Sequence, residues 1–174
     1  MKKIFLLTIF TTTAFGFMAQ CSSASKKPEQ GKIVKADIVS KSGTNVFGTV
    51  KFEQISEVEL KLTVELVGLK YGQHGFHIHE NGDCSAHDAE SAGGHWNPDD
   101  VDHGVHGSGH AGDLGNISAD KAGNVFAEIV TKNFSLGGER DVIGKAVIIH
   151  EDPDDFGTQP EGNAGKRAAC GVIK

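Results

Sequence analysis

Apolar and polar residues alternate along a series of short segments of the chain. These segments are 32–40, 45–54, 57–66, 75–80, 114–120, 125–131, 141–151 and 169–173. A period of two residues is typical of a β-strand with one buried face, and few long segments show the helical period. Turn sequences at 42–45 (SGTN) and 121–124 (KAGN) separate neighbouring segments. We therefore predict an all-β domain of about eight strands, folded as a Greek-key sandwich or flattened barrel.

Two long segments, 81–113 and 152–168, interrupt this alternation and are rich in glycine and polar residues. Loops of this length in a compact domain are usually either functional or disordered. We predict that both are functional loops.

The strand predicted over 75–80 places two histidines on one face. Residues two apart point the same way, so His77 and His79 lie opposite Phe76 and Ile78. The two imidazoles would be roughly 6 to 7 Å apart, which suits two ligands of one metal. For an isolated pair, two solvated histidines on a half-exposed strand are the better explanation. The rest of the chain decides, because all but one of its nine histidines fall between residues 74 and 110.

The segment 93–113 adds more histidines and an aspartate to this region. It contains His95, His103, His106, His110 and Asp113 at irregular spacing. Imidazole suits copper and zinc, and a carboxylate can complete a tetrahedral zinc site. A loosely binding histidine-rich tract is the alternative, but irregular spacing and structured flanks favour a defined metal loop.

Length and charge narrow the classes of function. A chain of 174 residues with 38% hydrophobic residues is enough for one domain. Its net charge is −6, and the chain lacks the basic character of proteins that bind nucleic acids. An acidic protein repels an anionic substrate unless positive charge is concentrated near the site.

The N-terminus has the composition of a targeting segment. Lys2 and Lys3 precede an apolar run over 4–19 that is short for a membrane span. The run ends just before Cys21, which resembles a bacterial lipoprotein signal in which this cysteine becomes the lipidated first residue. Ordinary cleavage after Ala24 is the alternative. We predict that the protein is exported to the periplasm or cell envelope and is held at the membrane by a lipid anchor. We divide the chain into a signal peptide over 1–20, a flexible tether over 21–31 and a domain over 32–174.

The chain has three cysteines, an odd number that needs explaining in an exported protein. If Cys21 carries lipid, then Cys84 and Cys170 remain, and an oxidising compartment permits a disulfide between them. Loss of the signal peptide also removes Lys2 and Lys3, which takes the net charge from −6 to −8.

Five segments together resemble the copper/zinc superoxide dismutases, in the exported form of bacteria. In chain order they are GFHIHENGDC (75–84), SAGGHWNP (91–98), HAGDLGNISAD (110–120), VIIHEDPDD (147–155) and GNAGKRAACGVI (162–173). The resemblance covers residues 33–173 and implies the fold predicted above. It also implies one copper and one zinc per chain, and conversion of superoxide to oxygen and hydrogen peroxide by alternate reduction and re-oxidation of the copper.

The resemblance implies a ligand set for each metal. The copper ligands would be His77, His79, His95 and His150. The zinc ligands would be His95, His103, His110 and Asp113. His95 would bridge the two metals and carry a proton during the reaction. His106 lies between two zinc ligands and could replace one of them, and the segment from His103 to His110 is shorter than usual in the family.

Supporting roles follow from the same resemblance. Asp154 would hydrogen-bond a copper histidine and a zinc histidine, although an aspartate in this context is otherwise a surface turn residue. Arg167 would hold superoxide beside the copper, with a solvated surface arginine as the alternative. Cys84 and Cys170 would form a disulfide between the first long loop and the last strand. His74 would be structural, and His87 matches nothing in the family.

A different class of function stays open at this point. A superoxide-dismutase-like fold can serve as a metal-binding or docking module without turnover. Such a module would be expected to lack a metal ligand or the arginine, whereas all seven ligands and Arg167 are present here. We predict an enzyme acting on superoxide, with no nucleic-acid partner and with a homodimer as a possible assembly.

Overall fold

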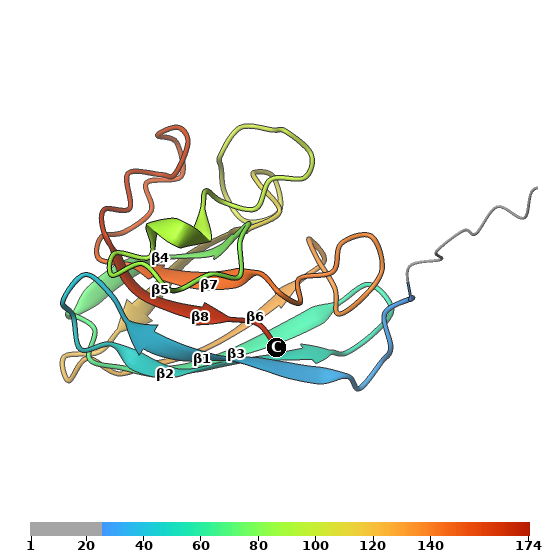
Figure 1. The fold of residues 1–174 in the computed structure, drawn as a ribbon, viewed down its shortest axis with the longest axis horizontal. Helices are drawn as coiled ribbons and strands as arrows, with labels where there is room; N and C mark the ends of the chain where they lie inside the picture. The colour runs from blue at the N-terminus through green and yellow to red at the C-terminus, as the bar shows by residue number, and fades with distance from the viewer. Residues whose placement is uncertain (1–25) are drawn as a thin grey trace, which may run out of the picture.

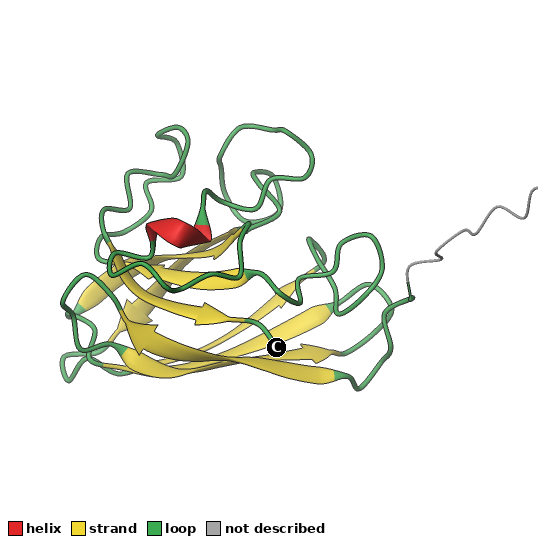
Figure 2. Ribbon diagram, in the orientation of Figure 1, coloured by secondary structure: helices red, strands yellow, loops and turns green. Residues whose placement is uncertain are grey.

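The computed structural model describes residues 26–174 and consists almost entirely of β-strands (Figures 1 and 2). The predicted signal peptide, the lipidation site Cys21 and the alternative cleavage site after Ala24 lie outside the described residues. Within that range the only helical element is a short 3-10 turn, η1 (Glu90–Ala92). The prediction of an all-β fold with eight strands is confirmed by β1 (Ile33–Ser40), β2 (Phe47–Gln54), β3 (Leu60–Val67), β4 (Gly72–His79), β5 (Asp113–Ala119), β6 (Val125–Thr131), β7 (Ala146–His150) and β8 (Arg167–Val172).

The strands form one antiparallel sheet in the order β5-β4-β7-β8-β1-β2-β3-β6. Its two end strands, β5 and β6, follow each other in sequence, and the turn between them brings both ends of the sheet to one side. The sheet therefore curves into a nearly closed barrel (Figure 1). The chain crosses between the halves of the barrel after β3 and again after β6, which is a Greek-key connection.

Alternate residues of each strand fill the barrel. Phe52 of β2 and Leu62 of β3 are directly paired and fully buried, and each stabilises the fold by about 1.5–3 kcal/mol. Strand β4 departs from this alternation, because every residue from His74 to His79 is buried on both faces. The two long loops, over 80–112 and 151–166, lie above β4 and β7 and cover their outer face (Figure 1).

Two strands begin at least three residues later in the structure than predicted. Strand β7 spans Ala146–His150 instead of 141–151, because Gly144 adopts a φ of 84° and the N–H of Lys145 donates to the carbonyl of Val142 in a turn. Strand β3 begins at Leu60 instead of 57, because the Oγ of Ser56 accepts the N–H of Glu59 at 3.1 Å and closes a turn. Both differences come from local hydrogen bonds that compete with the strand ladder.

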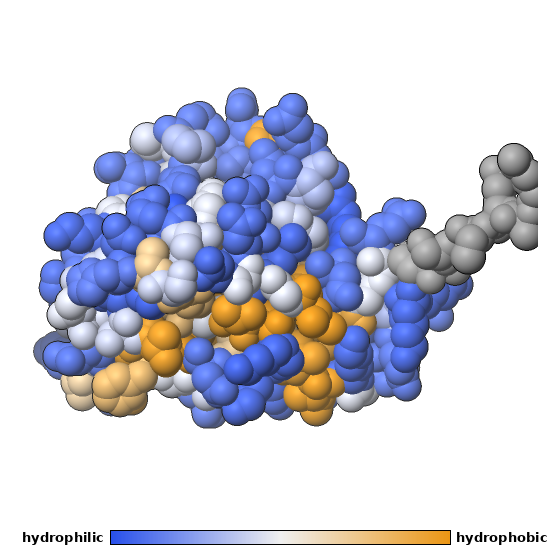
Figure 3. All heavy atoms as spheres, viewed as in Figure 1, coloured by the Kyte–Doolittle hydropathy of each residue, from blue (hydrophilic) through white to orange (hydrophobic). Residues whose placement is uncertain are grey.

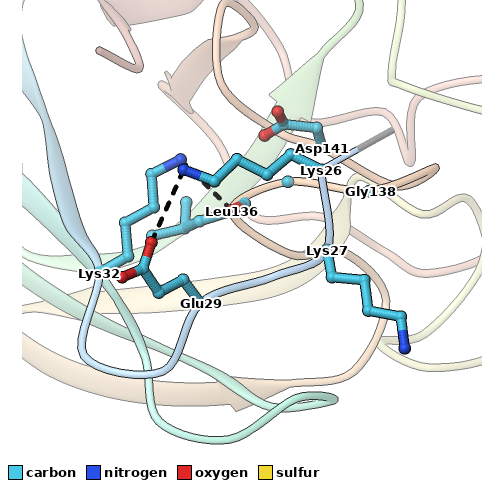
Figure 4. A pocket seen from close by; sticks show the side chains of 8 residues that line it. Lys26, Lys27, Glu29, Lys32, Leu136, Gly138 and Asp141 are labelled. Atoms are coloured by element: carbon cyan, nitrogen blue, oxygen red, sulfur yellow. Dashed lines mark hydrogen bonds and ion pairs between the residues drawn. The ribbon is translucent and has the colours of Figure 1, made fainter. Parts of the chain in front are cut away.

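The described part of the predicted tether lies on the loop between β6 and β7 (Figure 4). Lys32 Nζ donates to the carbonyl of Leu136 at 3.3 Å. Gly137 allows the close approach, since a Cβ atom there would lie 2.9 Å from the carbonyl oxygen of Lys26. The ion pair between Lys26 and Glu29, at 3.8 Å, is largely exposed to solvent and contributes little stability.

The surface differs between the loops and the strands below them. The two long loops present mainly hydrophilic residues, whereas apolar side chains gather over β8 and β1 (Figure 3). Val39 of β1 is half exposed and Ile33 is 55% exposed. No helix among residues 26–174 is long and apolar enough to cross a membrane.

Candidate metal centre

Strand β4 presents two histidines to one side and packs the barrel with the other. Phe76 and Ile78 belong to the core, while His77 and His79 are fully buried under the loops. The alternative of two solvated histidines on a half-exposed strand is therefore wrong. A β-bulge between Gly75 and His77 changes the register against β5 just before the first of these histidines, and bulges are known to re-aim side chains in this way.

The first cluster consists of four buried histidines from three parts of the chain. Potential ligand atoms of all four lie within 4.8 Å of one another. His150 is the last residue of β7, which pairs with β4. His95 lies within the loop over 80–112 and forms an isolated β-bridge with His79, the last residue of β4. The cluster contains His77, His79, His95 and His150.

Each of these four rings directs an unpaired nitrogen into the cluster. Among the described residues no hydrogen-bond partner faces His77 Nδ1, His79 Nε2, His95 Nε2 or His150 Nε2. Buried polar atoms are rarely left without a partner, so four converging ring nitrogens of this kind fit a set of metal ligands. Four nitrogen ligands suit copper.

The second cluster adds a carboxylate to three histidines. Its ligand atoms also lie within 4.8 Å of one another, and its members are His95, His103, His110 and Asp113. Asp113 Oδ1 lies 2.8 Å from His95 Nδ1 and 3.3 Å from His110 Nδ1. Three nitrogens and one oxygen, all from buried residues, are a donor set that fits a structural zinc site.

His95 belongs to both clusters. Its Nδ1 faces Asp113, while its Nε2 faces the first cluster without a partner in the described chain. Its ring centroid lies 4.0 Å from that of His77 and 5.3 Å from that of His103. One imidazole therefore lies between the two sets of ligand atoms.

Burial sets the protonation state of the cluster. Desolvation lowers the pKa of His77 and of His79 well below the usual range, and it lowers the pKa of His150 to about 3. Burial alone would raise the pKa of Asp113, but the hydrogen bond from His95 and the N–H of Gly104 lower it to about 2. Neutral imidazoles and an ionised carboxylate are the forms that bind metal ions.

Asp154 contacts one histidine of each cluster. His77 Nε2 lies 2.9 Å from its Oδ2, and His103 Nε2 lies 2.9 Å from its Oδ1. Both hydrogen bonds are buried, so this aspartate is no surface turn residue. A carboxylate that accepts from the outer nitrogen of each ring directs the opposite nitrogen, Nδ1, toward the metal position.

The surroundings of Asp154 were missed in the sequence. Asn116 of β5 accepts the N–H of Asp154 at 2.8 Å and donates to its carbonyl at 2.9 Å. Gly162, with a φ of 65°, lies so close that a Cβ atom there would collide with the carboxylate and with His103. Gln159 holds the other loop, since its side chain accepts from the N–H of His103 at 2.8 Å and donates to the His103 carbonyl at 3.0 Å.

Arg167 begins β8 beside the first cluster, paired across the sheet with His150. Its side chain is only 7% exposed, which excludes a solvated surface arginine. Nη1 donates to the carbonyl of Ala89 at 2.9 Å, and Nη2 lies 3.4 Å from Glu161 Oε1. The guanidinium charge contributes to the lowered pKa of His79 and of His150. Glu161 was also missed, because spacing within a long loop says little about contacts.

The remaining histidines lie outside both clusters. His74 is buried, with ring nitrogens 2.9 Å from the carbonyl of His150 and 2.8 Å from that of Lys70, which is a structural role. His106 belongs to neither cluster and lies 3.0 Å from Thr131 Oγ1, so the structure gives no support for His106 as a replacement zinc ligand. His87 is exposed.

The predicted disulfide between Cys84 and Cys170 is confirmed. It joins the loop over 80–112 to β8 and holds η1, whose preceding residue Ala89 supplies the carbonyl that binds Arg167. Lys41 donates to the carbonyls of Cys84 and Ala86, which fixes the same stretch from the other side. A disulfide that closes a loop of this size is typically worth about 2–4 kcal/mol.

Comparison with known proteins gives consistent results. A family model described as copper/zinc superoxide dismutase (SODC) matches residues 46–173. The chain is 42% identical over 149 residues to "Extracellular superoxide dismutase [Cu-Zn]" of Caenorhabditis elegans, covering 81% of this chain and 66% of that protein. It is 40% identical over 164 residues to the protein of the same name from Drosophila melanogaster, covering 88% and 90%. The crystal structure of the clock protein EA4 superposes with a TM-score of 0.75 at 35% identity, covering 85% of this chain and 95% of that one.

Proposed function

The chain belongs to the copper/zinc superoxide dismutase family, and on that premise we propose that it disproportionates superoxide. Two superoxide anions and two protons give one dioxygen and one hydrogen peroxide. The observation that carries the proposal is the pair of buried ligand clusters that share His95 beside a buried arginine. Family membership supports copper and zinc as the cofactors.

Each of the two clusters is assigned to one metal. We assign His77, His79, His95 and His150 to copper, and His95, His103, His110 and Asp113 to zinc. Copper would supply the one-electron chemistry, accepting an electron from one superoxide and returning it to the next. His95 Nε2 would hold a proton and release it to the peroxide, while its Nδ1 stays fixed on the zinc side. General acid catalysis of this kind suits imidazole.

Arg167 would bind the substrate anion. Its guanidinium is held rigidly by β8 and by the carbonyl of Ala89, so it offers positive charge in a fixed position next to His150. A non-catalytic metal-binding or docking module would be expected to lack a ligand or the arginine, whereas here all seven candidate ligands converge and Arg167 is buried.

Metal loading and dismutation of the purified mature protein test the proposal. We expect one copper and one zinc per chain, a copper absorption spectrum that changes when zinc is added, and rapid loss of superoxide. The spectrum responds because both metals would bind the same ring. Two sites that fill independently would contradict the bridge, and full loading without dismutation would contradict the enzyme.

A matched pair of histidines in one loop serves as the control. His103→Ala removes a predicted zinc ligand and is expected to lower zinc affinity about 10-fold or more. His106→Ala removes only a hydrogen bond to Thr131 and is expected to leave loading unchanged. Equal losses in both variants would argue against the assigned ligand set.

We further propose that the protein is exported and anchored in the cell envelope by lipid on Cys21. The apolar N-terminal run supports export, as do the names of the two curated relatives, both of which contain the word extracellular. A possible homodimer stays a prediction, which the mass of the purified protein in solution would decide.

The lipid anchor makes a direct prediction about Cys21. The natural protein is expected in the membrane and detergent fractions, whereas Cys21→Ser is expected in the soluble fraction, because one lipidated residue is the only predicted anchor. The matched control is Ser22→Ala, which keeps the cysteine and should stay with the membrane. A soluble natural protein that begins after Ala24 would rule the anchor out.

A further inference from the structure

Arg167 already has an oxygen in front of each of its two terminal nitrogens. Nη1 donates to the Ala89 carbonyl, and Nη2 is in ion-pair contact with Glu161. The first partner is the backbone carbonyl of Ala89, a buried residue in a segment that the Cys84–Cys170 disulfide ties to β8, so its position is fixed. The second is the end of a side chain that is 33% exposed, so it can.

The Glu161 carboxylate also lies close to Gly94, the residue that precedes His95. A Cβ atom placed on Gly94 would be 3.9 Å from Glu161 Oε1, which puts this oxygen next to the backbone that leads into His95. The loop over 151–166 therefore brings a negative charge next to Arg167 and next to the backbone before His95. No other carboxylate in residues 26–174 forms an ion pair with Arg167.

We propose that Glu161 competes with small anions for Arg167 and so sets the anion affinity of the site. The inference rests on the proposed function, because it concerns how the same site admits its anionic substrate. A small anion that approaches the guanidinium must displace the Glu161 carboxylate or share Nη2 with it. The carboxylate thus lowers the affinity of the site for every small anion, superoxide included.

The contact is weak enough to be displaced. At 3.4 Å it is longer than the 2.7–2.9 Å of a strong charge-assisted hydrogen bond. One third of the Glu161 side chain meets solvent, which places the pair among those that are worth about 2- to 5-fold in an equilibrium constant. Glu161 therefore tunes the affinity of the site for anions without closing it.

A purely structural role for Glu161 makes the opposite prediction. If the carboxylate were needed to hold Arg167 in place, removing it would weaken anion binding. The arginine, however, keeps its bond to Ala89, its place at the start of β8 and its burial without Glu161. Removal is therefore expected to strengthen anion binding.

Glu90 provides a matched control. Glu90 and Arg167 both line an open depression of about 360 Å³, whose other lining residues are Ser42, His87, Asp88 and Lys166. Glu90 carries the same charge as Glu161 but forms no ion pair with Arg167. Glu90→Gln therefore reports the long-range effect of removing one negative charge near the site.

Azide binding to the copper- and zinc-loaded protein tests the proposal, followed by the change in copper absorption. Glu161→Gln is expected to bind azide about 2- to 5-fold more tightly than the natural protein, and Glu90→Gln less than about 1.5-fold more tightly. The amide of Glu161→Gln could still accept a hydrogen bond from Arg167. Glu161→Ala has no side-chain acceptor and should show the same gain in azide affinity. The superoxide rate constant should rise in parallel at low ionic strength.

Two outcomes would overturn the proposal. Equal gains in the Glu161 and Glu90 variants would show a general effect of charge, and weaker azide binding in both Glu161 variants would show a clamp that holds Arg167. These outcomes differ from a failure of the proposed function. That function fails if the natural protein, loaded with copper and zinc, does not dismutate superoxide, whereas the present inference depends on the azide affinities of the variants.

Discussion

Replacing Asp154 by asparagine is expected to lower zinc affinity by about 10- to 100-fold. The carboxylate accepts from His77 on one oxygen and from His103 on the other, and both contacts are 2.9 Å and buried. An amide of the same shape offers one acceptor and one donor. One of the two imidazole N–H groups would then face an N–H₂ group, and that ring would lose its orientation.

The measurement is a competition between the purified variant and a chromophoric zinc chelator. The matched control is Asp155→Asn, since Asp155 is exposed and its carboxylate binds only Thr158 and Gly157 of its own loop. We expect the control to bind zinc within about twofold of the natural protein, as surface changes do. Equal loss in both variants would assign the effect to loop stability, and no loss in Asp154→Asn would remove its proposed role.

Replacing Arg167 by alanine is expected to lower the dismutation rate by roughly 10-fold while both metals and the fold are retained. The mature chain would have a net charge of −8, given −6 for the whole sequence and the loss of Lys2 and Lys3. Such a protein repels superoxide at long range, so fast turnover requires positive charge focused near the site. Arg167 is the buried cation beside His150, and Arg167→Glu is expected to be slower still.

Ionic strength provides a second readout. The rate of the natural protein should fall as salt rises, because the Debye length at 0.15 M is only about 8 Å. The rate of Arg167→Glu should instead increase with salt, since the sign of the local charge is reversed. Lys166→Ala removes the same charge from an exposed neighbour and is expected to change the rate by less than about twofold. Full activity in Arg167→Ala at unchanged metal content would contradict the role of Arg167.

Removing the charge of Glu161 and removing the charge of Arg167 are expected to have opposite effects on anion affinity. Neutralising Glu161 should strengthen anion binding, whereas neutralising Arg167 should weaken it. If Glu161 acts only through Arg167, its removal should change little once Arg167 is alanine. The double variant therefore separates direct competition for the guanidinium from a general effect of net charge.

Residue type and local period determine much of this protein without tertiary information. Alternation predicts the eight strands, because each strand must bury one face, and it places His77 and His79 on the same face. The nature of the ligands, nitrogen with one carboxylate, depends only on side-chain chemistry. Strand ends were predicted less well, since the turns at Ser56 and Gly144 depend on hydrogen bonds between a few neighbouring residues.

The contact of Asp154 with a histidine of each cluster was expected from the family resemblance, but only the tertiary structure decided which further groups meet across the loops. Gln159 reaches His103 because the loop over 151–166 packs against the loop over 80–112. The contact between Glu161 and Arg167 likewise has no signal in the sequence, because a loop residue has no periodicity that fixes the direction of its side chain. Strands impose a repeat that can be read along the chain, whereas the packing of two irregular loops depends on the barrel that brings them together.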